Sequence, residues 1–377
     1  MKFSTITGQR KLKEKIIENI NNGRVSHAQL FLGNEGAGSL ALALAYFQYL
    51  CCDNKLETDS CGECSSCKKH QKMIHPDLHF IFPTNKVEKR EALSNNFLVE
   101  WRSFVLKNPY QNLFDWVSVL GIENKQASIN VEEAEQIILK LKLRPYESKY
   151  KMMVIWLAEK MNLQAANKIL KILEEPEGQT VFILISESQE DLLPTIISRT
   201  QTINVPPISA DEMKEHLVTH FQLDNEKALD ISNISNGNYC VAMELLFEST
   251  ETGYNNFEQY KFWMRSCYSQ KILELLKWTD EISSTGREVQ KNFIQYALKN
   301  VRDNLAISVN APETSRTTKS ESEFSVKFHQ FIHTRNIRLI HDELTKAYSD
   351  IERNVNSKMV FFDLSLKLCG HLRILNN

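Results

Sequence analysis

The chain has 377 residues and a formal net charge of −2. It is too long for one compact core, because single domains usually hold about 100–200 residues. The near-neutral charge excludes a chain that binds polyanions over its whole surface, although it allows a local basic face. Met1 to Gln9 lack the features of a signal peptide, and no run reaches the roughly 18 apolar residues of a membrane span. We expect two or three domains in a cytosolic protein with no membrane partner.

The first 205 residues show strands that alternate with helices. Ala28 to Leu32, for example, is a short apolar run with turn signals on both sides, which is typical of a buried strand. The same reasoning gives helices at residues 10–22, 129–143 and 162–173, and further strands at residues 78–82, 151–157 and 180–186. This alternation indicates a parallel α/β sheet.

Residues 83–126 are polar and aromatic and show no clear period, so we expect an insertion there. Its aromatic residues include Trp101, Tyr110, Phe114 and Trp116. Aromatic residues at such spacing are more often core than ligand site, and nothing in the sequence selects a partner-docking role for them.

After Pro206 and Pro207 the strand pattern stops. Helices are predicted at residues 211–221, 226–231 and 239–247, a polar linker at residues 248–256, and further helices up to Asn377 around a Ser/Thr-rich break at residues 311–322. The sequence therefore predicts an α/β domain at residues 1–205, a helical lid domain at residues 206–250 and an all-helical domain at residues 257–377.

Four cysteines of the α/β domain have the spacing C-x8-C-x2-C-x2-C. The set is Cys52, Cys61, Cys64 and Cys67. Clustered cysteines in a large cytosolic chain indicate a metal site rather than a disulfide framework. Four thiolates complete the tetrahedral shell of zinc and leave no open position, so we expect a structural zinc module at about residues 51–70. Cys51 is expected to be a buried apolar residue, and His70 and His75 are weaker candidates for ligands.

A glycine-rich segment follows the first predicted strand. It reads Gly33-Asn34-Glu35-Gly36-Ala37-Gly38-Ser39-Leu40. A working P-loop reads G-x-x-x-x-G-K-[ST], in which the lysine neutralises the β- and γ-phosphates and the hydroxyl holds Mg²⁺. Ser39 and Leu40 fill neither role, and Glu35 adds a negative charge inside the loop. The three glycines therefore form either a chance turn or a disabled phosphate loop.

A nucleotide site also needs an acidic residue at the end of a strand, to orient Mg²⁺ and water. The strand that begins at Lys151 continues into Trp156 and Leu157, which carry no carboxylate. Glu159 lies beyond the strand end, where a solvated or capping role is expected. The sequence thus lacks a second part of an ATP site.

Several segments together resemble the clamp-loader branch of AAA+ proteins. They are Ile6 to Gln9, His27 to Gly33, Lys151 to Met161, Gln164 to Pro176, Phe182 to Leu184 and Leu193 to Arg199. A zinc knuckle inserted after the P-loop helix is found in the bacterial gamma/tau and delta-prime subunits of that branch. The resemblance covers residues 1–246 except residues 83–126. In the last third it is weaker and rests on Arg302-Asp303 and Glu352-Arg353-Asn354, which resemble the oligomerisation helices of the family.

The resemblance implies an AAA+-like parallel sheet of the P-loop NTPase type with a zinc-knuckle insertion, a helical lid and a helical oligomerisation domain. It also implies a complex with gamma/tau ATPase subunits and a delta subunit, which opens a sliding clamp and loads it on primed DNA. The chain departs from the motor pattern at Ser39-Leu40, at Trp156-Leu157 and at Val241, where the second sensor of the family has an arginine. These departures imply a non-catalytic stator subunit of the delta-prime type that binds no ATP. A gamma/tau-type ATPase motor is the alternative.

Ser198-Arg199-Thr200 matches the Ser-Arg-Cys motif of the family, with threonine in place of cysteine. The resemblance implies that Arg199 is an arginine finger, which acts in trans on the ATP of a neighbouring subunit. A guanidinium suits this role because it stays ionised and forks onto oxygen atoms. Taken without the preceding Leu193-Pro194-Thr195, Arg199 would be interpreted as a surface arginine that ends a strand–loop segment, and with them the finger is favoured.

A third interpretation is an unrelated zinc module that contacts nucleic acid itself. Such modules carry basic and aromatic residues around the metal. Here the lysines that follow the cluster are offset by acidic residues within it. The lysines are Lys68, Lys69 and Lys72, and the acidic residues are Glu57, Asp59 and Glu63. The sequence therefore disfavours this interpretation, which strong salt-dependent binding of DNA by the isolated chain would revive.

Overall fold

The computed structural model of the chain describes residues 1–142, 144–246, 256–308 and 319–374. Its contacts divide the chain into two compact units. Unit 1 comprises residues 1–122 and 127–247, and unit 2 comprises residues 123–126 and 248–377. Unit 1 holds all the strands of the described residues, whereas unit 2 is built from helices.

The sheet of unit 1 has five parallel strands in the order β2-β3-β4-β1-β5. The strands are β1 (Ala28–Leu32), β2 (Leu78–Ile81), β3 (Lys151–Ile155), β4 (Thr180–Ser186) and β5 (Gln201–Asn204). β1 lies between β4 and β5, and Leu30 pairs with Leu184 on one side and Thr202 on the other. The parallel sheet, with a glycine turn after its inner strand β1, confirms the predicted fold class.

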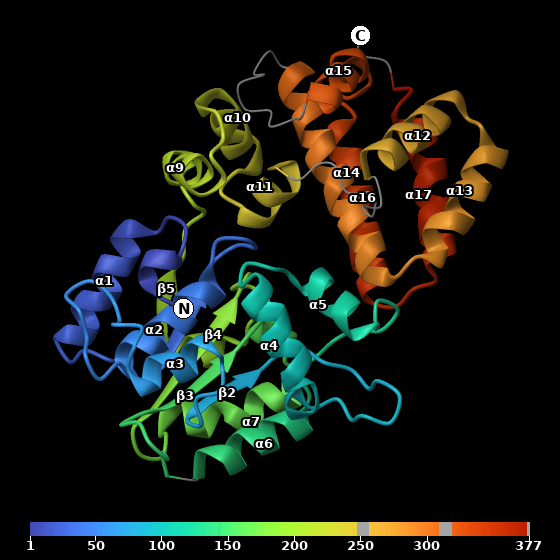
Figure 1. The fold of residues 1–377 in the computed structure, drawn as a ribbon. Helices are drawn as coiled ribbons and strands as arrows, with labels where there is room; N and C mark the ends of the chain where they lie inside the picture. The colour runs from blue at the N-terminus through green and yellow to red at the C-terminus, as the bar shows by residue number, and fades with distance from the viewer. Residues whose placement is uncertain (143, 247–255, 309–318, 375–377) are drawn as a thin grey trace. The chain divides into compact units, whose positions relative to one another are not determined.

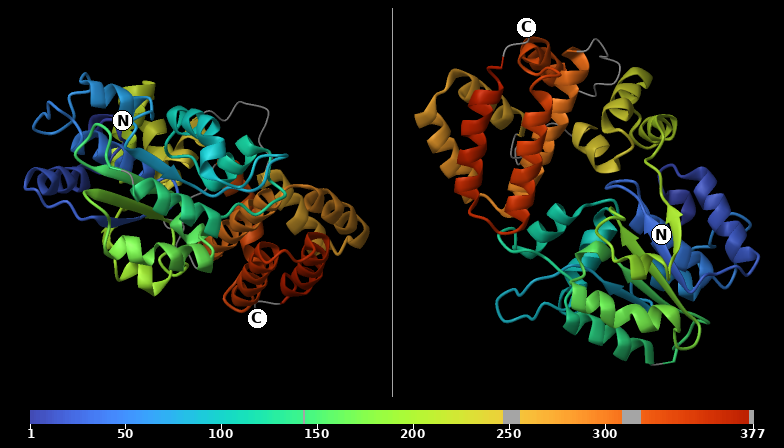
Figure 2. Two further views of the ribbon diagram at one scale, coloured as in Figure 1. Left: turned by 90° about the horizontal axis from the view of Figure 1, so that it is seen from below. Right: turned by 180° about the vertical axis from the view of Figure 1, so that it is seen from behind.

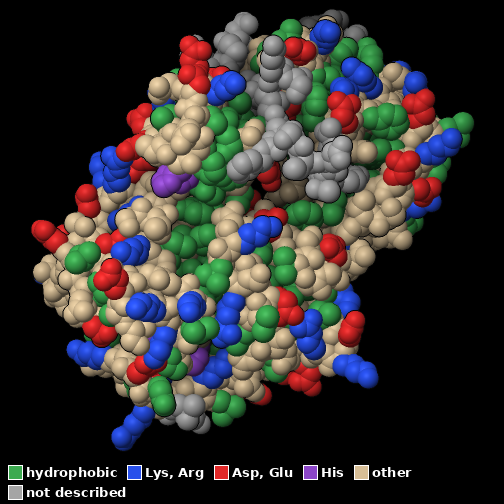
Figure 3. All heavy atoms as spheres, viewed as in Figure 1, with side chains coloured by type: hydrophobic (Ala, Val, Ile, Leu, Met, Phe, Trp, Pro, Cys, Tyr) green, Lys and Arg blue, Asp and Glu red, His purple; other side chains and the backbone are tan. Residues whose placement is uncertain are grey.

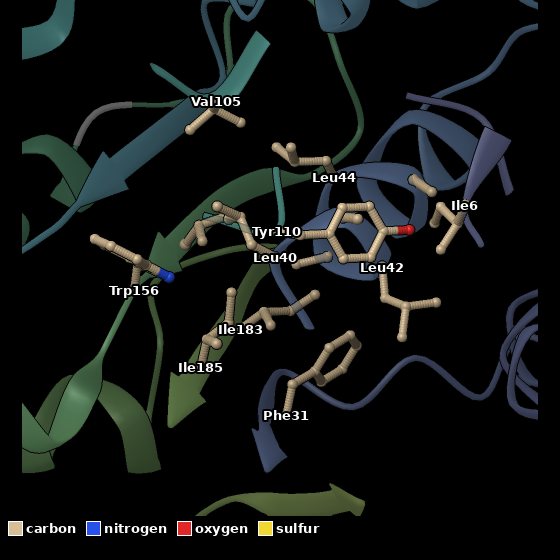
Figure 4. Close-up of a cluster of buried hydrophobic side chains, with 14 of the residues drawn as sticks. Ile6, Phe31, Leu40, Leu42, Leu44, Val105, Tyr110, Trp156, Ile183 and Ile185 are labelled. Carbon is tan, nitrogen blue, oxygen red and sulfur yellow. The ribbon is translucent and has the colours of Figure 1, made fainter. Parts of the chain in front are cut away.

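Helices cover both faces of this sheet. The helices of the sheet region are α1 (Arg10–Asn21), α2 (Ser39–Leu50), α3 (Ser65–Gln71), α6 (Val131–Lys142), α7 (Leu163–Glu174) and α8 (Pro194–Ile197). Successive side chains of a strand point to opposite faces. Along β4, Ile183 and Ile185 accordingly pack with α2, whereas Phe182 and Leu184 pack with α6 and α7. Figures 1 and 2 show α6 and α7 together on one face, and Figure 4 shows the cluster around α2.

The segment predicted as an insertion contributes to the main core of unit 1. It contains a 3₁₀ turn at Ser94–Phe97 and the helices α4 (Leu98–Lys107) and α5 (Leu113–Leu120). Trp101 and Trp116 are fully buried, and Trp101 stacks on Phe82 with ring centroids 4.2 Å apart. The ring centroid of Trp156, directly after β3, lies 5.1 Å from that of Trp101. Trp101, Tyr110 and Trp116 of this segment therefore pack as core, whereas Phe114 is only partly buried.

Three further helices complete unit 1, namely α9 (Ala210–Phe221), α10 (Asn225–Ser235) and α11 (Tyr239–Leu246). They match the helices expected after Pro207. Besides the turn at Ser94–Phe97, unit 1 has short 3₁₀ turns at Phe3–Thr5 and Ala158–Lys160. The predicted linker at residues 248–256 lies outside the described residues except for Asn256, which begins the next helix.

Unit 2 has its own apolar core. Its elements are α12 (Asn256–Ser269), α13 (Ile272–Ser284), α14 (Arg287–Ser308), α15 (Lys319–Phe328), a 3₁₀ turn (His329–Phe331), α16 (Ile337–Glu352) and α17 (Ser357–His371). Trp263 stacks on Trp278 with centroids 5.1 Å apart, and Phe293 and Phe361 pack on Trp278. The predicted break at residues 311–322 lies outside the described residues up to residue 318, and its last four residues belong to α15. No helix in the described part of the chain has the length and apolar character for crossing a membrane.

Candidate zinc site, glycine loop and arginine segment

The four predicted cysteine ligands lie together in unit 1. The sulfur atoms of Cys52, Cys61, Cys64 and Cys67 all lie within 4.8 Å of one another. Tetrahedral zinc with Zn–S bonds of about 2.3 Å places its sulfur ligands about 3.8 Å apart. The Sγ–Sγ distances of 3.5 Å between Cys52 and Cys61 and 3.9 Å between Cys61 and Cys67 fit that spacing. The donor set and its geometry therefore suit a four-thiolate metal site.

Backbone N–H groups support these sulfur atoms. Cys61 Sγ accepts from the N–H of Glu63 and of Cys64, each at 3.4 Å, and Cys64 Sγ accepts from the N–H of Cys67. Gly62 makes the turn between them with φ +79°, a conformation that glycine adopts without steric cost. Such donors favour the thiolate form, which is the form that binds metal. The local backbone is thus arranged for ligation.

The weaker ligand candidates lie outside this cluster. His70 is buried in α3 and stacks on His75 with ring centroids 4.4 Å apart. The Sγ of Cys51 lies 3.3 Å from the Sδ of Met152 in β3. Among the residues that the structure describes, the cysteine set is the only group of three or more potential metal ligands with this spacing.

The glycine loop between β1 and α2 is covered by side chains of the protein itself. Gly36 and Gly38 have φ values of +72° and +92°, and Gly38 precedes the first residue of α2. A Cβ atom on Gly38 would lie 2.8 Å from Cε1 of Tyr110, and one on Gly36 would lie 2.0 Å from Oδ1 of Asn238. In a P-loop, phosphate groups make this close approach to the backbone. In this chain the side chains of Tyr110 and Asn238 lie against these two glycines.

Tyr110 is held over the loop by several contacts. Its hydroxyl accepts a hydrogen bond from the backbone N–H of Thr7 at 2.9 Å, and its ring stacks on Tyr239 with centroids 4.2 Å apart. The N–H of Tyr239 donates to the carbonyl of Gly36 at 3.1 Å. Burial raises the pKa of Tyr110 to about 12, so the phenol stays protonated at neutral pH. Figure 4 shows Tyr110 among the buried side chains beside α2.

Glu35, the acidic residue of the loop, is paired with amides of the covering segments. Its Oε1 accepts from Nδ2 of Asn112 at 3.0 Å and from Nδ2 of Asn238 at 3.4 Å. Ser39 and Leu40, which stand in the lysine and hydroxyl positions, are both buried at the start of α2. The loop is therefore joined to α5 and α11 by hydrogen bonds.

The two residues that follow β3, where an ATP site needs a carboxylate, are buried apolar side chains. Trp156 is 4% exposed and lies in the aromatic cluster with Trp101. Leu157 is buried and has φ +54°. Glu159 lies in the 3₁₀ turn that follows, where its Oε1 accepts from the N–H of Glu187 at 3.3 Å. The end of β3 thus belongs to the apolar core.

Arg199 follows the short helix α8 and precedes the edge strand β5. Its Nε donates to Oε2 of Glu174, the last residue of α7, at 3.0 Å. Its Nη1 donates to the carbonyl of Thr195 at 3.2 Å and to the hydroxyl of Ser198 at 3.4 Å. The side chain remains 32% exposed. Thr200, the departure from the family motif, donates its hydroxyl to the carbonyl of Ile196.

Comparison with known proteins assigns the family. Residues 8–209, more than half of the chain, match the family model described as DNA polymerase III, delta subunit. The delta-prime subunit of DNA polymerase III from Bacillus subtilis is 29% identical over 238 residues, which cover 63% of this chain and 59% of that protein. The chain belongs to the DNA polymerase III delta-prime family.

Two further relatives place this membership in context. The delta-prime subunit from Pseudomonas aeruginosa is 30% identical over 179 residues, 47% of this chain and 43% of that protein. The tau/gamma subunit from Haemophilus influenzae is 20% identical over 215 residues, 57% of this chain and 25% of that protein. The chain therefore matches less than two thirds of the length of these curated relatives.

Sequence reasoning missed the residues that cover the glycine loop in this member of the delta-prime family. Tyr110 and Asn112 come from the segment predicted as an insertion, and Asn238 comes from the turn before α11. Glu174, the partner of Arg199, was also not foreseen. The one available signal was the aromatic character of residues 83–126, which predicted core but not its location.

Proposed function

We propose that this chain is the delta-prime subunit of a bacterial clamp-loading complex, and that it acts there as a non-catalytic stator during DNA replication. In this role it works with gamma/tau ATPase subunits and a delta subunit to load a sliding clamp on primed DNA. Family membership supports the complex. The observation that carries the stator role is the covering of the glycine loop by Tyr110 and Asn238.

The covered loop argues against ATP binding. The side chains of Tyr110 and Asn238 pack against Gly38 and Gly36 of the loop, and Ser39 supplies no positive charge to offset a nucleotide. A nucleotide would have to displace the stacked pair of Tyr110 and Tyr239 and the amide contacts of Glu35. The proposed subunit therefore takes part in the complex without turning over ATP itself.

The nucleotide test is an equilibrium titration of the purified chain with a fluorescent ATP analogue and Mg²⁺. We expect no binding up to millimolar nucleotide. Tight, magnesium-dependent binding would overturn the stator role and restore the ATPase motor as the leading function.

The proposed contribution to catalysis is Arg199, which would act in trans on ATP bound by the adjacent subunit. An arginine finger stabilises the charge of the transferring γ-phosphate, which in GTPases is worth about 10³–10⁵ in rate. Arg199 is partly exposed and ends a segment that precedes an edge strand, so it is accessible to a neighbour. The zinc that the cysteine set would hold is structural in this proposal, because four thiolates leave no position for a substrate.

The test of Arg199 uses the reconstituted complex. Arg199→Ala is expected to abolish ATP hydrolysis at the adjacent site. The clamp- and DNA-stimulated ATPase rate of the complex should then fall by the fraction that this site contributes. Arg24→Ala, which removes an exposed arginine after α1, is the matched control and should leave the rate unchanged. An unchanged rate with Arg199→Ala in a fully assembled complex would disprove the role of this residue.

A further inference from the structure

Glu174 and Arg199 form an ion pair between two elements of unit 1. Glu174 is the last residue of α7, and Arg199 follows α8. Their side chains meet through Nε of Arg199 and Oε2 of Glu174, 3.0 Å apart. We propose that Glu174 is a positioning residue, which holds the guanidinium of Arg199 in the orientation that it needs toward a γ-phosphate on a neighbouring subunit. This inference rests on the proposed role of Arg199.

The location of Glu174 supports a role that depends on its partner. The C-terminal end of a helix carries a partial negative charge, so a carboxylate there is unfavourable unless a cation compensates it. Lys171 is the basic residue in the last turn of α7, and Arg199 contacts Glu174 directly. The chain thus places an acidic side chain at an unfavourable helix end, where it meets the guanidinium of Arg199.

The contacts of Arg199 fix the plane of its guanidinium from two sides. Glu174 accepts from Nε, while the carbonyl of Thr195 and the hydroxyl of Ser198 accept from Nη1. Within the described residues, no hydrogen bond uses Nη2. A guanidinium is planar and rigid, so anchoring Nε and Nη1 also sets the direction of Nη2. Nη2 is the donor left for a phosphate oxygen.

Positioning, rather than stability, is the effect expected of this pair. The side chains of Arg199 and Glu174 are 32% and 58% exposed, and exposed ion pairs contribute little to folding. A donor that already has its productive direction needs no reorganisation when charge develops in the transition state. Loss of Glu174 should therefore lower the rate of the step that Arg199 assists and leave nucleotide binding by the neighbour unchanged.

The test compares variants of the full chain in the complex reconstituted with its ATPase subunits. The quantity measured is the Arg199-dependent part of kcat, which is the difference between the wild-type rate and the rate with Arg199→Ala. Glu174→Ala is expected to lower this part about two- to fivefold, with KM for ATP and complex assembly unchanged. Glu175→Ala is the matched control, since it removes the same charge one residue further along and should leave the rate unchanged.

Two further variants separate positioning from a general structural effect. Glu174→Gln keeps an oxygen that can accept from Nε and is expected to restore part of the lost rate. In a chain that already carries Arg199→Ala, Glu174→Ala should have no further effect, because its action passes through the guanidinium.

The outcomes distinguish this inference from the proposed function. If Arg199→Ala lowers the rate but Glu174→Ala matches Glu175→Ala, the positioning role of Glu174 is wrong and the role of Arg199 stands. If Arg199→Ala itself leaves the rate unchanged, the proposed function fails, and the positioning role fails with it. If Glu174→Ala does not assemble, Glu174→Gln decides. An Arg199-dependent rate below that of the wild type, with KM for ATP unchanged, supports the inference, and a wild-type rate overturns it.

Discussion

Tyr110 connects three parts of unit 1 that are far apart in the sequence. Its hydroxyl accepts from the N–H of Thr7, its ring lies against Gly38, and it stacks on Tyr239. Tyr239 begins α11, whereas Gly38 immediately precedes α2. A single side chain thus ties the glycine loop to the helices that follow the sheet.

Replacing Tyr110 tests how much this contact stabilises unit 1. Tyr110→Phe leaves the buried N–H of Thr7 without its acceptor, which should lower the free energy of unfolding by about 1–2 kcal/mol. Tyr110→Ala also removes the ring and should cost about 3–5 kcal/mol. The shift of the urea midpoint measures both effects, and Tyr146→Phe, at a side chain that is 84% exposed, is the control. Equal midpoints for Tyr110→Phe and the wild type would show that the contact contributes nothing.

The buried carboxylate of Asp77 leads to a second prediction at this scale, on how the free energy of unfolding depends on pH. It is 3% exposed, and its carboxylate accepts from the backbone N–H groups of Tyr146, Glu147 and Ser148 at 2.5 to 2.9 Å. Burial alone would raise its pKa, but the three N–H donors outweigh burial and hold the pKa below its usual value. The ionised carboxylate therefore stabilises the turn that leads into β3.

The sign of the pH effect follows from that lowered pKa. The stabilisation is fully present above the unfolded-state pKa of about 3.9 and is lost as pH falls through the lower folded-state pKa. Asp77→Asn should therefore lower the free energy of unfolding by about 1.5–3 kcal/mol at pH 7, and the difference from wild type should shrink below about pH 4. Denaturant titrations at several pH values measure this, with the exposed Asp230→Asn as control. A difference that stays constant down to pH 2 would contradict the argument.

At the scale of elements, the sequence predicts β1, β2, β3 and β4 but not the edge strand β5. β1, β3 and β4 are mostly apolar because helices cover both of their faces, and this pattern is visible without a structure. β5 reads Gln-Thr-Ile-Asn, and three of its four residues are exposed. Its strand conformation depends on pairing with β1, which lies about 170 residues earlier in the chain. Such a long-range pairing leaves no local signal.

The zinc site and the glycine loop also differ in how far apart their residues lie in the sequence. The zinc ligands lie within 16 residues of one another, so their spacing alone predicts the cluster. The covering of the glycine loop joins Gly38 to Tyr110 and Gly36 to Asn238, across separations of 72 and 202 residues. Sequence shows which groups the loop has lost, namely the lysine and the hydroxyl. It does not show which side chains of the folded chain pack against the loop.

The zinc module offers a prediction at the scale of an element. Asp59 accepts from the N–H groups of Phe3 and Ser4 at 3.1 and 2.9 Å, so the cysteine-rich segment also holds the first turn of the chain. We expect one zinc per chain and, after its removal by a chelator, faster hydrogen exchange in α3 and at Phe3 and Ser4. Exchange in β3 and β4 should not change, because their amides are in the sheet.

Metal content and hydrogen–deuterium exchange with mass spectrometry are the measurements. Cys67→Ser should lose the metal, whereas Cys51→Ser should keep it, since Cys51 lies outside the cluster. Unchanged exchange in α3 after complete removal of zinc would contradict a structural role.

At the scale of the whole molecule, the chain has two units with separate cores, and the candidate sites lie in unit 1. Unit 1 contains the cysteine cluster, the covered glycine loop and Arg199. Acidic and basic side chains both occur over the face shown in Figure 3, in line with the near-zero net charge. The role of the last third of the chain in oligomerisation stays a prediction, because it comes from the family resemblance alone.

The separate core of unit 2 leads to the prediction that residues 256–377 fold without unit 1. The core holds three aromatic residues in mutual contact, Trp263, Trp278 and Phe293, and Phe361 of α17 packs on two of them. Because a domain with its own apolar core can fold alone, the fragment should be helical and should unfold in one cooperative transition. Far-ultraviolet circular dichroism during urea titration measures this. Trp278→Ala should lower the midpoint strongly, since it leaves a large cavity, whereas Leu273→Ala, at a side chain that is 78% exposed, should not. A broad transition that is insensitive to Trp278→Ala would mean that the core forms only in the presence of unit 1.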